Sequence, residues 1–145
     1  MSETVTSKRS LIVEWGDCDP ADIVFYPNYF SWFDASTASH FNSVGLPKQI
    51  LLERFSIIGY PMVDTRGKFY IPSSYGDELT VETKIVKFGN SSFEVEHRLY
   101  RDNVLAVECF EKRVMVRKKS NGSDIEALPV PEDIKVLFQF YPPYD

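Results

Sequence analysis

Apolar and small side chains recur at helical spacing after Tyr26. They occupy positions 29, 30, 33, 37, 38, 41 and 44, as is typical of a buried helix face. Pro27 suits the first turn of a helix, since the N–H that proline lacks would have no partner there. Gly45 is a typical C-terminal stop, and Pro47 prevents continuation. The pattern predicts a helix over residues 27–44, about 27 Å long, whose many aromatic side chains indicate burial on most sides.

Much of the remaining chain alternates apolar and polar positions, as half-buried strands do. The strands that we predict span residues 11–15, 62–70 with a break near Gly67, 78–88, 92–101 and 104–117. The turn sequences Gly89-Asn90-Ser91 and Asp102-Asn103 are short, so the strands that they join must be antiparallel neighbours. We also expect short helices over residues 48–55 and 134–138.

This order of elements, one strand, one long helix and then four antiparallel strands, predicts an α+β fold. An apolar helix and a curved sheet must cover each other, so we expect the sheet to wrap around the helix. Such a sheet has two edge strands without partners, and pairing with a second copy of the chain is a common remedy. We expect residues 1–145 to form one domain.

The composition is that of an ordinary globular protein, with 43% apolar and 26% charged residues. The net charge of −5 argues against a nucleic-acid partner, because proteins that bind phosphate backbones usually carry a basic face. A local basic group at positions 112, 113 and 117–119 is either a site for an anionic small ligand or a solvated strand end and turn.

The sequence contains no sign of a membrane, a metal or a cofactor. No stretch approaches the roughly 20 apolar residues of a membrane span, and the first ten residues lack the apolar run of a secretory signal. Cys18 and Cys109 do not make a disulfide framework. His40 and His97 lack zinc spacing and have no acid partner in register, so we interpret each as a surface or core side chain. We expect a cytoplasmic protein.

The segment 17–29, DCDPADIVFYPNY, carries the strongest chemical signal. It places three carboxylates, those of Asp17, Asp19 and Asp22, in a loop directly before the predicted helix. Helix starts have unpaired N–H groups and a partial positive charge, which stabilise an oxyanion. A carboxylate beside such a site is most of what acyl transfer or thioester hydrolysis requires. We expect Asp17 to accept hydrogen bonds from loop N–H groups instead of taking part in the chemistry.

Residues 16–21 (GDCDPA) and 23–29 (IVFYPNY) resemble the signature of the 4-hydroxybenzoyl-CoA thioesterase family. Weaker similarity follows, in the same order, at residues 45–47, 59–61, 74–77 and 130–131. The resemblance implies a hotdog fold, in which a five- to six-stranded antiparallel sheet wraps a long helix. It also implies hydrolysis of an aromatic or short-chain acyl-CoA thioester by a homodimer or homotetramer with sites at the subunit interface.

The resemblance also implies roles for single residues. The family's catalytic aspartate falls on Asp19, and the backbone N–H that polarises the thioester carbonyl falls on Tyr26. Asp19 would either attack the thioester, giving a short-lived anhydride, or act as a general base on water; the sequence leaves both open. Because Pro27 has no N–H, Asn28 would supply the next free donor. Phe25 lies at the same helix start, and we predict that Phe25 and Asn28 contact the substrate.

Two further residues are candidates for contact with the acyl group. Asp34, within the helix, would either accept a hydrogen bond from a substrate hydroxyl or be a partly exposed acid bonded locally. Tyr60 stands where relatives can have a small hydroxyl residue. It would either shorten or contact the acyl pocket, or pack in the core.

The chain departs from the family pattern at two places. Asp22 stands where the family usually has glycine; aspartate is among the few residues that tolerate a positive φ, so we expect the loop conformation to survive. The turn at residues 89–91 lacks the basic residues that can hold the CoA phosphates in the family. Lys84, Lys87 or the run 117–119 could hold the CoA phosphates instead. Alternatively, the acyl group could be carried by another pantetheine carrier in place of CoA.

Two other functions fit the same fold. A hotdog-fold hydratase or dehydratase would pair a histidine with an acid, and neither His40 nor His97 can be placed beside Asp19 from the sequence. A non-catalytic module that binds acyl thioesters would keep the pocket without needing Asp19.

Overall fold

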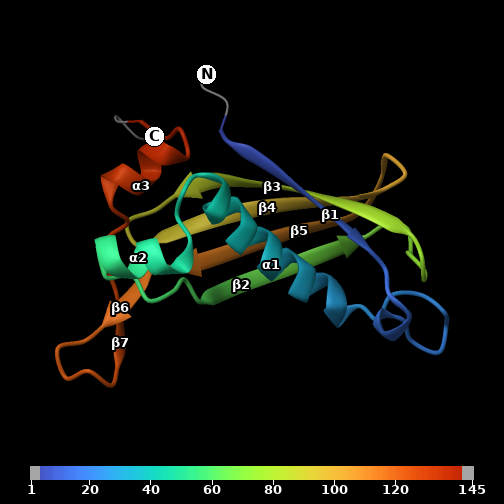
Figure 1. The fold of residues 1–145 in the computed structure, drawn as a ribbon, viewed down its shortest axis with the longest axis horizontal. Helices are drawn as coiled ribbons and strands as arrows, with labels where there is room; N and C mark the ends of the chain where they lie inside the picture. The colour runs from blue at the N-terminus through green and yellow to red at the C-terminus, as the bar shows by residue number, and fades with distance from the viewer. Residues whose placement is uncertain (1–3, 142–145) are drawn as a thin grey trace.

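The computed structural model describes residues 4–141, in which one long helix lies against one curved sheet (Figure 1). The helices are α1 (Pro27–Ser43), α2 (Lys48–Phe55) and α3 (Glu132–Leu137), and a short 3-10 turn spans Trp15–Asp17. The strands are β1 (Thr6–Ile12), β2 (Met62–Phe69), β3 (Glu78–Phe88), β4 (Ser92–Arg101), β5 (Val104–Val114), β6 (Val116–Lys118) and β7 (Ile125–Ala127). The predicted α+β fold is confirmed.

Five strands form the main sheet in the order β1-β3-β4-β5-β2, and every neighbouring pair is antiparallel. The consecutive strands β3, β4 and β5 make the centre, whereas β1 and β2 are the two edge strands. β6 and β7 form a separate hairpin, which projects from the end of the molecule near α2 (Figure 1). The start of α1 lies toward the other end.

Helix α1 packs on the concave face of the sheet, as its pattern predicts. Its buried side chains recur every three or four residues, at Tyr29, Phe33, Ser36, Thr37, His40 and Phe41. The strands β3 and β4 alternate buried and less buried residues along most of their length, so one face of each strand meets the helix. The helix and the sheet thus share one apolar layer, and the two ends of α1 are left at the surface.

Two predicted strands differ from those observed. β1 runs over Thr6–Ile12 instead of residues 11–15, because its ladder with β3 ends where Ile12 pairs with Glu78, the first residue of β3. β2 is not broken at Gly67, which pairs in register with Cys109. A Cβ at Gly67 would lie 3.2–3.4 Å from the rings of Phe69 and Phe30. This glycine therefore allows close packing within a continuous strand.

The predicted strand over residues 104–117 is two strands. β5 ends at Val114, and the Met115 N–H donates to the Ser91 carbonyl instead of continuing the ladder. β6 then pairs with β7, in the register Val116 with Ala127. The β6–β7 hairpin was missed because its second strand has only three residues.

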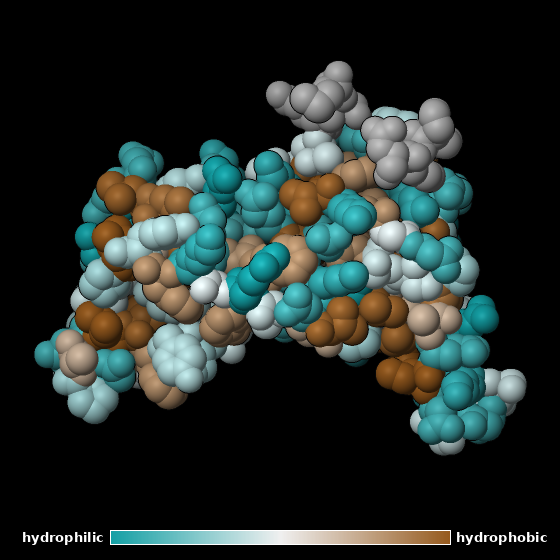
Figure 2. Space-filling view, turned by 180° about the vertical axis from the view of Figure 1, so that it is seen from behind, coloured by the Kyte–Doolittle hydropathy of each residue, from teal (hydrophilic) through white to brown (hydrophobic). Residues whose placement is uncertain are grey.

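The sheet's outer face and its edges differ in character. Seen from behind, hydrophilic and hydrophobic side chains are mixed over the middle of the molecule, and hydrophobic ones are visible both along its lower edge and at its upper left (Figure 2). Ion pairs on the outer face of the sheet include Arg98–Glu96 at 2.9 Å and Lys8–Glu82 at 3.4 Å. On the edge strand β2, Met62, Val63 and Phe69 are exposed. Within residues 4–141, no helix is long and apolar enough to cross a membrane.

Candidate active site

The loop before α1 is held by hydrogen bonds that its own carboxylate and carbonyl groups accept. The Asp17 carboxylate accepts the Glu14 N–H at 2.8 Å, which confirms the structural role predicted for Asp17. The Asp17 carbonyl accepts the Phe25 N–H at 2.9 Å and the side-chain amide of Asn28 at 2.8 Å. These contacts fix the loop against the first turn of the helix.

Asp19 lies in a tight turn inside this loop. Its carbonyl accepts the Asp22 N–H at 2.9 Å, and its Oδ1 accepts the Ala21 N–H at 2.8 Å. Asp22 has φ 64°, so the positive φ expected where the family has glycine is present and aspartate adopts it. The Asp19 side chain is half-buried, and its Oδ2 has no hydrogen-bond partner among residues 4–141. One carboxylate oxygen is held and the other is free.

The start of α1 offers one unpaired N–H group. The N–H groups of Val24, Phe25, Asn28 and Tyr29 all donate to carbonyls, and Pro27 has none. The Tyr26 N–H has no partner within the described part of the chain. The prediction that Asn28 supplies the next free donor is wrong, because its N–H donates to the Phe25 carbonyl at 2.9 Å. The first turn tightens to i→i+3 bonds and uses that donor.

An apolar hollow of about 370 Å³ lies beside Tyr26. It is lined by Ile23, Val24, Tyr26, Tyr29, Phe69, Tyr70, Ile71 and Pro72. Tyr29 is buried, and burial raises the pKa of its phenol, although the neighbouring Ser73 acts to lower it. Phe25 is half-exposed and packs edge-on against Tyr26, outside the residues that line the hollow. The hollow is open, and its walls are suited to a flat apolar group.

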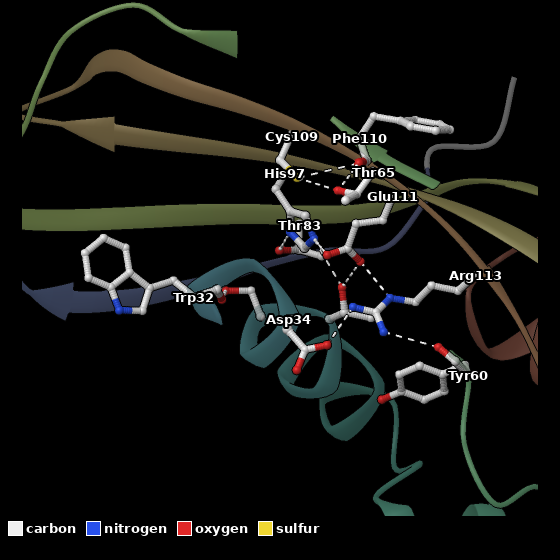
Figure 3. Close-up of polar contacts among 12 residues, drawn as sticks. Trp32, Asp34, Tyr60, Thr65, Thr83, His97, Cys109, Phe110, Glu111 and Arg113 are labelled. Carbon is white, nitrogen blue, oxygen red and sulfur yellow. Dashed lines mark hydrogen bonds and ion pairs between the residues drawn. The ribbon is translucent and has the colours of Figure 1, made fainter. Parts of the chain in front are cut away.

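Asp34 and Tyr60, separate in sequence, meet around Arg113 (Figure 3). Arg113 Nη2 donates to Asp34 Oδ1 at 2.8 Å, and Nη1 donates to the Tyr60 carbonyl at 3.2 Å. The Tyr60 ring stacks on Phe41 at 4.7 Å between centroids, and burial raises the pKa of its phenol. Tyr60 therefore packs against the core, one of the arrangements that the sequence left open, and its contact with an acyl group stays a prediction. Asp34 is exposed and is bonded to the sheet.

Behind Arg113 lies a buried polar cluster. Glu111 Oε1 accepts from Arg113 Nε at 2.8 Å and from the Thr37 hydroxyl at 2.7 Å, and Oε2 lies 3.1 Å from His97 Nε2. The Thr83 hydroxyl pairs with His97 Nδ1 at 2.8 Å. Burial alone would raise the pKa of Glu111, but its bonds to His97 and Arg113 outweigh burial and lower it to about 2. Burial alone would lower the pKa of Arg113, but its hydrogen bond with Glu111 and the charge of that carboxylate outweigh burial, so the pKa is raised.

Comparison with known proteins gives the family. Residues 13–138 match the thioesterase-like superfamily. The 4-hydroxybenzoyl-CoA thioesterase of Pseudomonas sp. strain CBS-3 is 36% identical over 140 residues, which cover 92% of this chain and 96% of that enzyme. This chain belongs to the thioesterase-like superfamily.

Solved structures of the superfamily agree with the fold. A crystal structure of an Asp-to-Asn variant of 4-hydroxybenzoyl-CoA thioesterase, in complex with 4-hydroxybenzoyl-CoA, matches with a TM-score of 0.84 and 35% identity, covering 92% of this chain and 98% of that one. A gentisyl-coenzyme A thioesterase matches with a TM-score of 0.77 and 30% identity, covering 91% and 98%. The predicted hotdog fold is confirmed.

The histidines of this superfamily member are core side chains. The expectation that His97 has no acid partner is wrong, because Glu111 comes from the neighbouring strand. However, His97 is 0% and Glu111 1% exposed, so this pair cannot reach a substrate. His40 is also buried, with its Nδ1 2.7 Å from the Ser7 hydroxyl. The hydratase alternative therefore finds no accessible histidine–acid pair among the described residues.

Sequence reasoning missed Glu111 and Arg113, although a signal was present. Cys109, Glu111 and Arg113 alternate in phase and all three are buried, so the strand period itself points both charges inward. Arg113 thus belongs neither to a basic ligand patch nor to a solvated strand end. Within residues 4–141 there is also no group of three or more side chains that could hold a metal ion.

The predicted site residues form two groups along α1. Asp19, Phe25, Tyr26 and Asn28 surround its first turn, whereas Asp34 and Tyr60 lie around Arg113. Tyr26 and Asp34 are eight residues apart, about 12 Å along the helix axis. The Asp34 carboxylate is bonded to Arg113 and makes no hydrogen bond or ion pair with the first group, so the two groups are separate in the described part of one chain.

Proposed function

We propose that this thioesterase hydrolyses aromatic acyl-CoA thioesters, with Asp19 and the Tyr26 N–H as its chemical groups. The observation that carries the proposal is the single unpaired N–H at the start of α1, beside an apolar hollow and a loop that presents a half-free carboxylate. A bound thioester would place its carbonyl oxygen against this N–H and the ring of its acyl group against the hollow, with the far end of the ring directed along α1 toward Asp34, which does not line the hollow.

In the proposed reaction, charge develops on the thioester oxygen and is stabilised by the Tyr26 N–H and the positive end of α1. Asp19 either attacks the carbonyl carbon or removes a proton from an attacking water. If Asp19 attacks, the carbon–sulfur bond breaks and a mixed anhydride forms on Asp19, which water then hydrolyses to give the acid and the free carboxylate. If water attacks, the carbon–sulfur bond breaks and the acid forms directly. In both routes the CoA thiolate leaves and takes up the proton that the water loses. The Ala21 N–H holds one oxygen of Asp19, so the other is oriented for this step.

The aromatic substrate class is supported by the hollow and by the relatives. Tyr29, Phe69 and Tyr70 contribute aromatic walls. Two of the relatives are named for hydroxylated aromatic substrates, 4-hydroxybenzoyl-CoA and gentisyl-CoA. Asp34, held by Arg113, is the proposed acceptor for a hydroxyl on the ring. Phe25 and Asn28 remain proposed substrate contacts at the helix start; within the chain Phe25 packs on Tyr26, and the side chain of Asn28 donates to the Asp17 carbonyl.

For the CoA phosphates we favour Arg117 and Lys118. With Lys48 they line a groove of about 610 Å³ between α2 and β6, whose floor includes Leu52 and Ile57. Lys87 is paired with Glu94 at 3.8 Å and Arg117 with Glu126 at 3.2 Å, so the choice rests on the groove and not on a free charge. The groove lies beyond the C-terminal end of α1, so in one chain it is far from Asp19.

We therefore propose a homodimer, or a tetramer built from such dimers, in which β2 pairs with β2 of a second copy. A two-fold axis beside this edge reverses the second copy, which brings its α2 groove next to the first copy's Asp19 loop. The exposed apolar side chains of β2 support this contact. Sedimentation velocity tests the dimer. A cytoplasmic location is part of the proposal, in keeping with the free thiols of Cys18 and Cys109.

The function is tested by thiol release from a panel of CoA thioesters with the wild-type protein. The panel should contain benzoyl, hydroxybenzoyl, phenylacetyl, short-chain and medium-chain acyl groups. We expect the highest kcat/KM for the aroyl thioesters, because their rings fit the hollow. Faster turnover of the aliphatic members would contradict the aromatic assignment, and no turnover of any member would favour a binding module.

A further inference from the structure

Arg113 is a buried cation with three fixed contacts. Its side chain is 5% exposed, and each of its three nitrogens donates to a different residue: Nε to Glu111, Nη1 to the Tyr60 carbonyl and Nη2 to Asp34. A planar guanidinium bonded on three sides has one orientation. Arg113 is therefore a rigid part of the sheet that reaches across to α1.

The cluster behind Arg113 keeps that orientation. Glu111 is 1% exposed and is itself bonded by Thr37 and His97, so its carboxylate cannot turn. His97 is held by Thr83 and stacks on Phe33 with ring centroids 5.0 Å apart. Because Thr37 and Asp34 are three residues apart on α1, the cluster ties one face of the helix to β5 at two successive points.

Asp34 has a different environment from the rest of the cluster. Its side chain is 68% exposed, and an exposed aspartate on a helix would ordinarily sample several rotamers. Here Oδ1 is bound to a buried guanidinium at 2.8 Å, whereas Oδ2 has no hydrogen-bond partner among residues 4–141. The carboxylate is thus held by one oxygen and presents the other outward.

We propose that Arg113 is a positioning residue that sets the acyl specificity of the enzyme through Asp34. It does not touch the substrate; it fixes the carboxylate whose free oxygen accepts the hydroxyl of a hydroxyaroyl group. The proposal rests on the proposed function, which places the thioester carbonyl at Tyr26. A hydroxyl para to that carbonyl lies farthest from it, and so it best spans the distance toward Asp34.

The test is the ratio of kcat/KM for 4-hydroxybenzoyl-CoA to that for benzoyl-CoA. In the wild type we expect a ratio of roughly ten to a hundred, the scale of one hydrogen bond to a charged group. Asp34→Asn should reduce the ratio to about 1. Arg113→Lys should reduce it about tenfold, because an ammonium group beside Glu111 cannot reproduce the fork that also holds Asp34. The double variant should have the same ratio of kcat/KM values as Asp34→Asn alone.

Asp34→Glu keeps the charge and changes only its position. It lies on the exposed face of α1, so folding is not at risk, and we expect it to lose most of the preference. Arg98→Lys, on the outer face of β4, is the matched control and should keep the wild-type ratio. Full preference in Asp34→Glu, or in a folded Arg113→Lys, would overturn the positioning role. An equal fall for both substrates in Arg113→Lys would reduce it to a structural role.

Binding separates this proposal from the proposed function. Affinities of the two thioesters for Asp19→Asn, measured by calorimetry, give the same ratio without turnover. A wild type that hydrolyses both thioesters equally, with equal binding, would contradict the role of Arg113 and leave the hydrolytic function standing. No turnover of either thioester, together with tighter binding of the hydroxylated one, would support the role of Arg113 and contradict the hydrolytic function.

Discussion

At the scale of single residues, the site depends on a few backbone conformations that particular side chains allow. Asp19 can present its carboxylate only because Asp22 takes a left-handed conformation, with φ 64°, and closes the turn onto the Asp19 carbonyl. Asp17 holds the same loop through the Glu14 N–H. The carboxylates of this loop therefore have separate roles: Asp19 is proposed for the chemistry, and Asp17 and Asp22 shape the loop.

A β-branched residue at position 22 should destabilise the loop. We expect Asp22→Val to lower the free energy of unfolding by about 1–2 kcal/mol, because it forces a branched side chain into the left-handed region. Asp22→Gly should stay within about 0.5 kcal/mol of the wild type, since glycine adopts that region freely. Urea unfolding of the three proteins measures this. Equal stability of the Val and Gly variants would show that the turn can rearrange.

At the scale of elements, α1 has one structural role and one proposed catalytic role: its buried face packs on the sheet, and its first turn offers the N–H that we propose as the oxyanion donor. Among the described residues, the Tyr26 N–H is the one free donor at this helix start. Pro27 has no N–H, and the tight first turn uses the N–H groups of Asn28 and Tyr29. Tyr26 itself has φ −55°, a value that proline also adopts.

Tyr26→Pro should therefore delete the oxyanion donor without breaking a hydrogen bond of the fold. We expect its kcat to fall on the order of 10²–10³ below that of Tyr26→Ala, which loses only the side chain. Steady-state thiol release from an aroyl-CoA measures both variants, with circular dichroism as the check on folding. Equal kcat values in two folded variants would remove the Tyr26 N–H from the mechanism.

The ends of an element could be predicted from the sequence where nearby residues, such as a proline, a glycine or a turn sequence, mark them. Pro27 and Gly45 gave α1 to within one residue at its end, and the turns at residues 89–91 and 102–103 gave the bounds of β4. The end of β5 was not predictable, because it depends on contacts of Val114 and Met115 with Pro61 and Ser91. The bond between Asp34 and Arg113 joins residues 79 apart in sequence. Local patterns contain no information on such pairs.

At the scale of the whole molecule, buried titratable groups link the fold to pH. His40, on the buried face of α1, is 1% exposed and packs against Phe138, and its Nε2 has no partner within residues 4–141. Burial, and to a lesser extent the charge of His97, lower its pKa from 6.5 to about 4. The folded protein thus holds His40 neutral at pH values where the unfolded chain is already protonated.

This difference predicts a loss of stability on acidification. Below pH 6.5 the unfolded chain binds a proton that the folded protein does not bind until about pH 4. The free energy of unfolding should therefore be highest above pH 6.5 and decline between pH 6.5 and 4, by on the order of 3 kcal/mol. His40→Gln should remove this decline between pH 7 and 5 in urea titrations. The same slope in wild type and variant would assign it to other groups.

The central claim is that Asp19 carries out thioester hydrolysis. The most direct test is kcat for an aroyl-CoA thioester in Asp19→Asn, measured beside the dissociation constant of the same thioester and the melting temperature. We predict that kcat falls at least 10²-fold, while binding and melting stay near their wild-type values. Near-normal turnover in a folded Asp19→Asn protein would contradict the account and require another residue to perform the reaction.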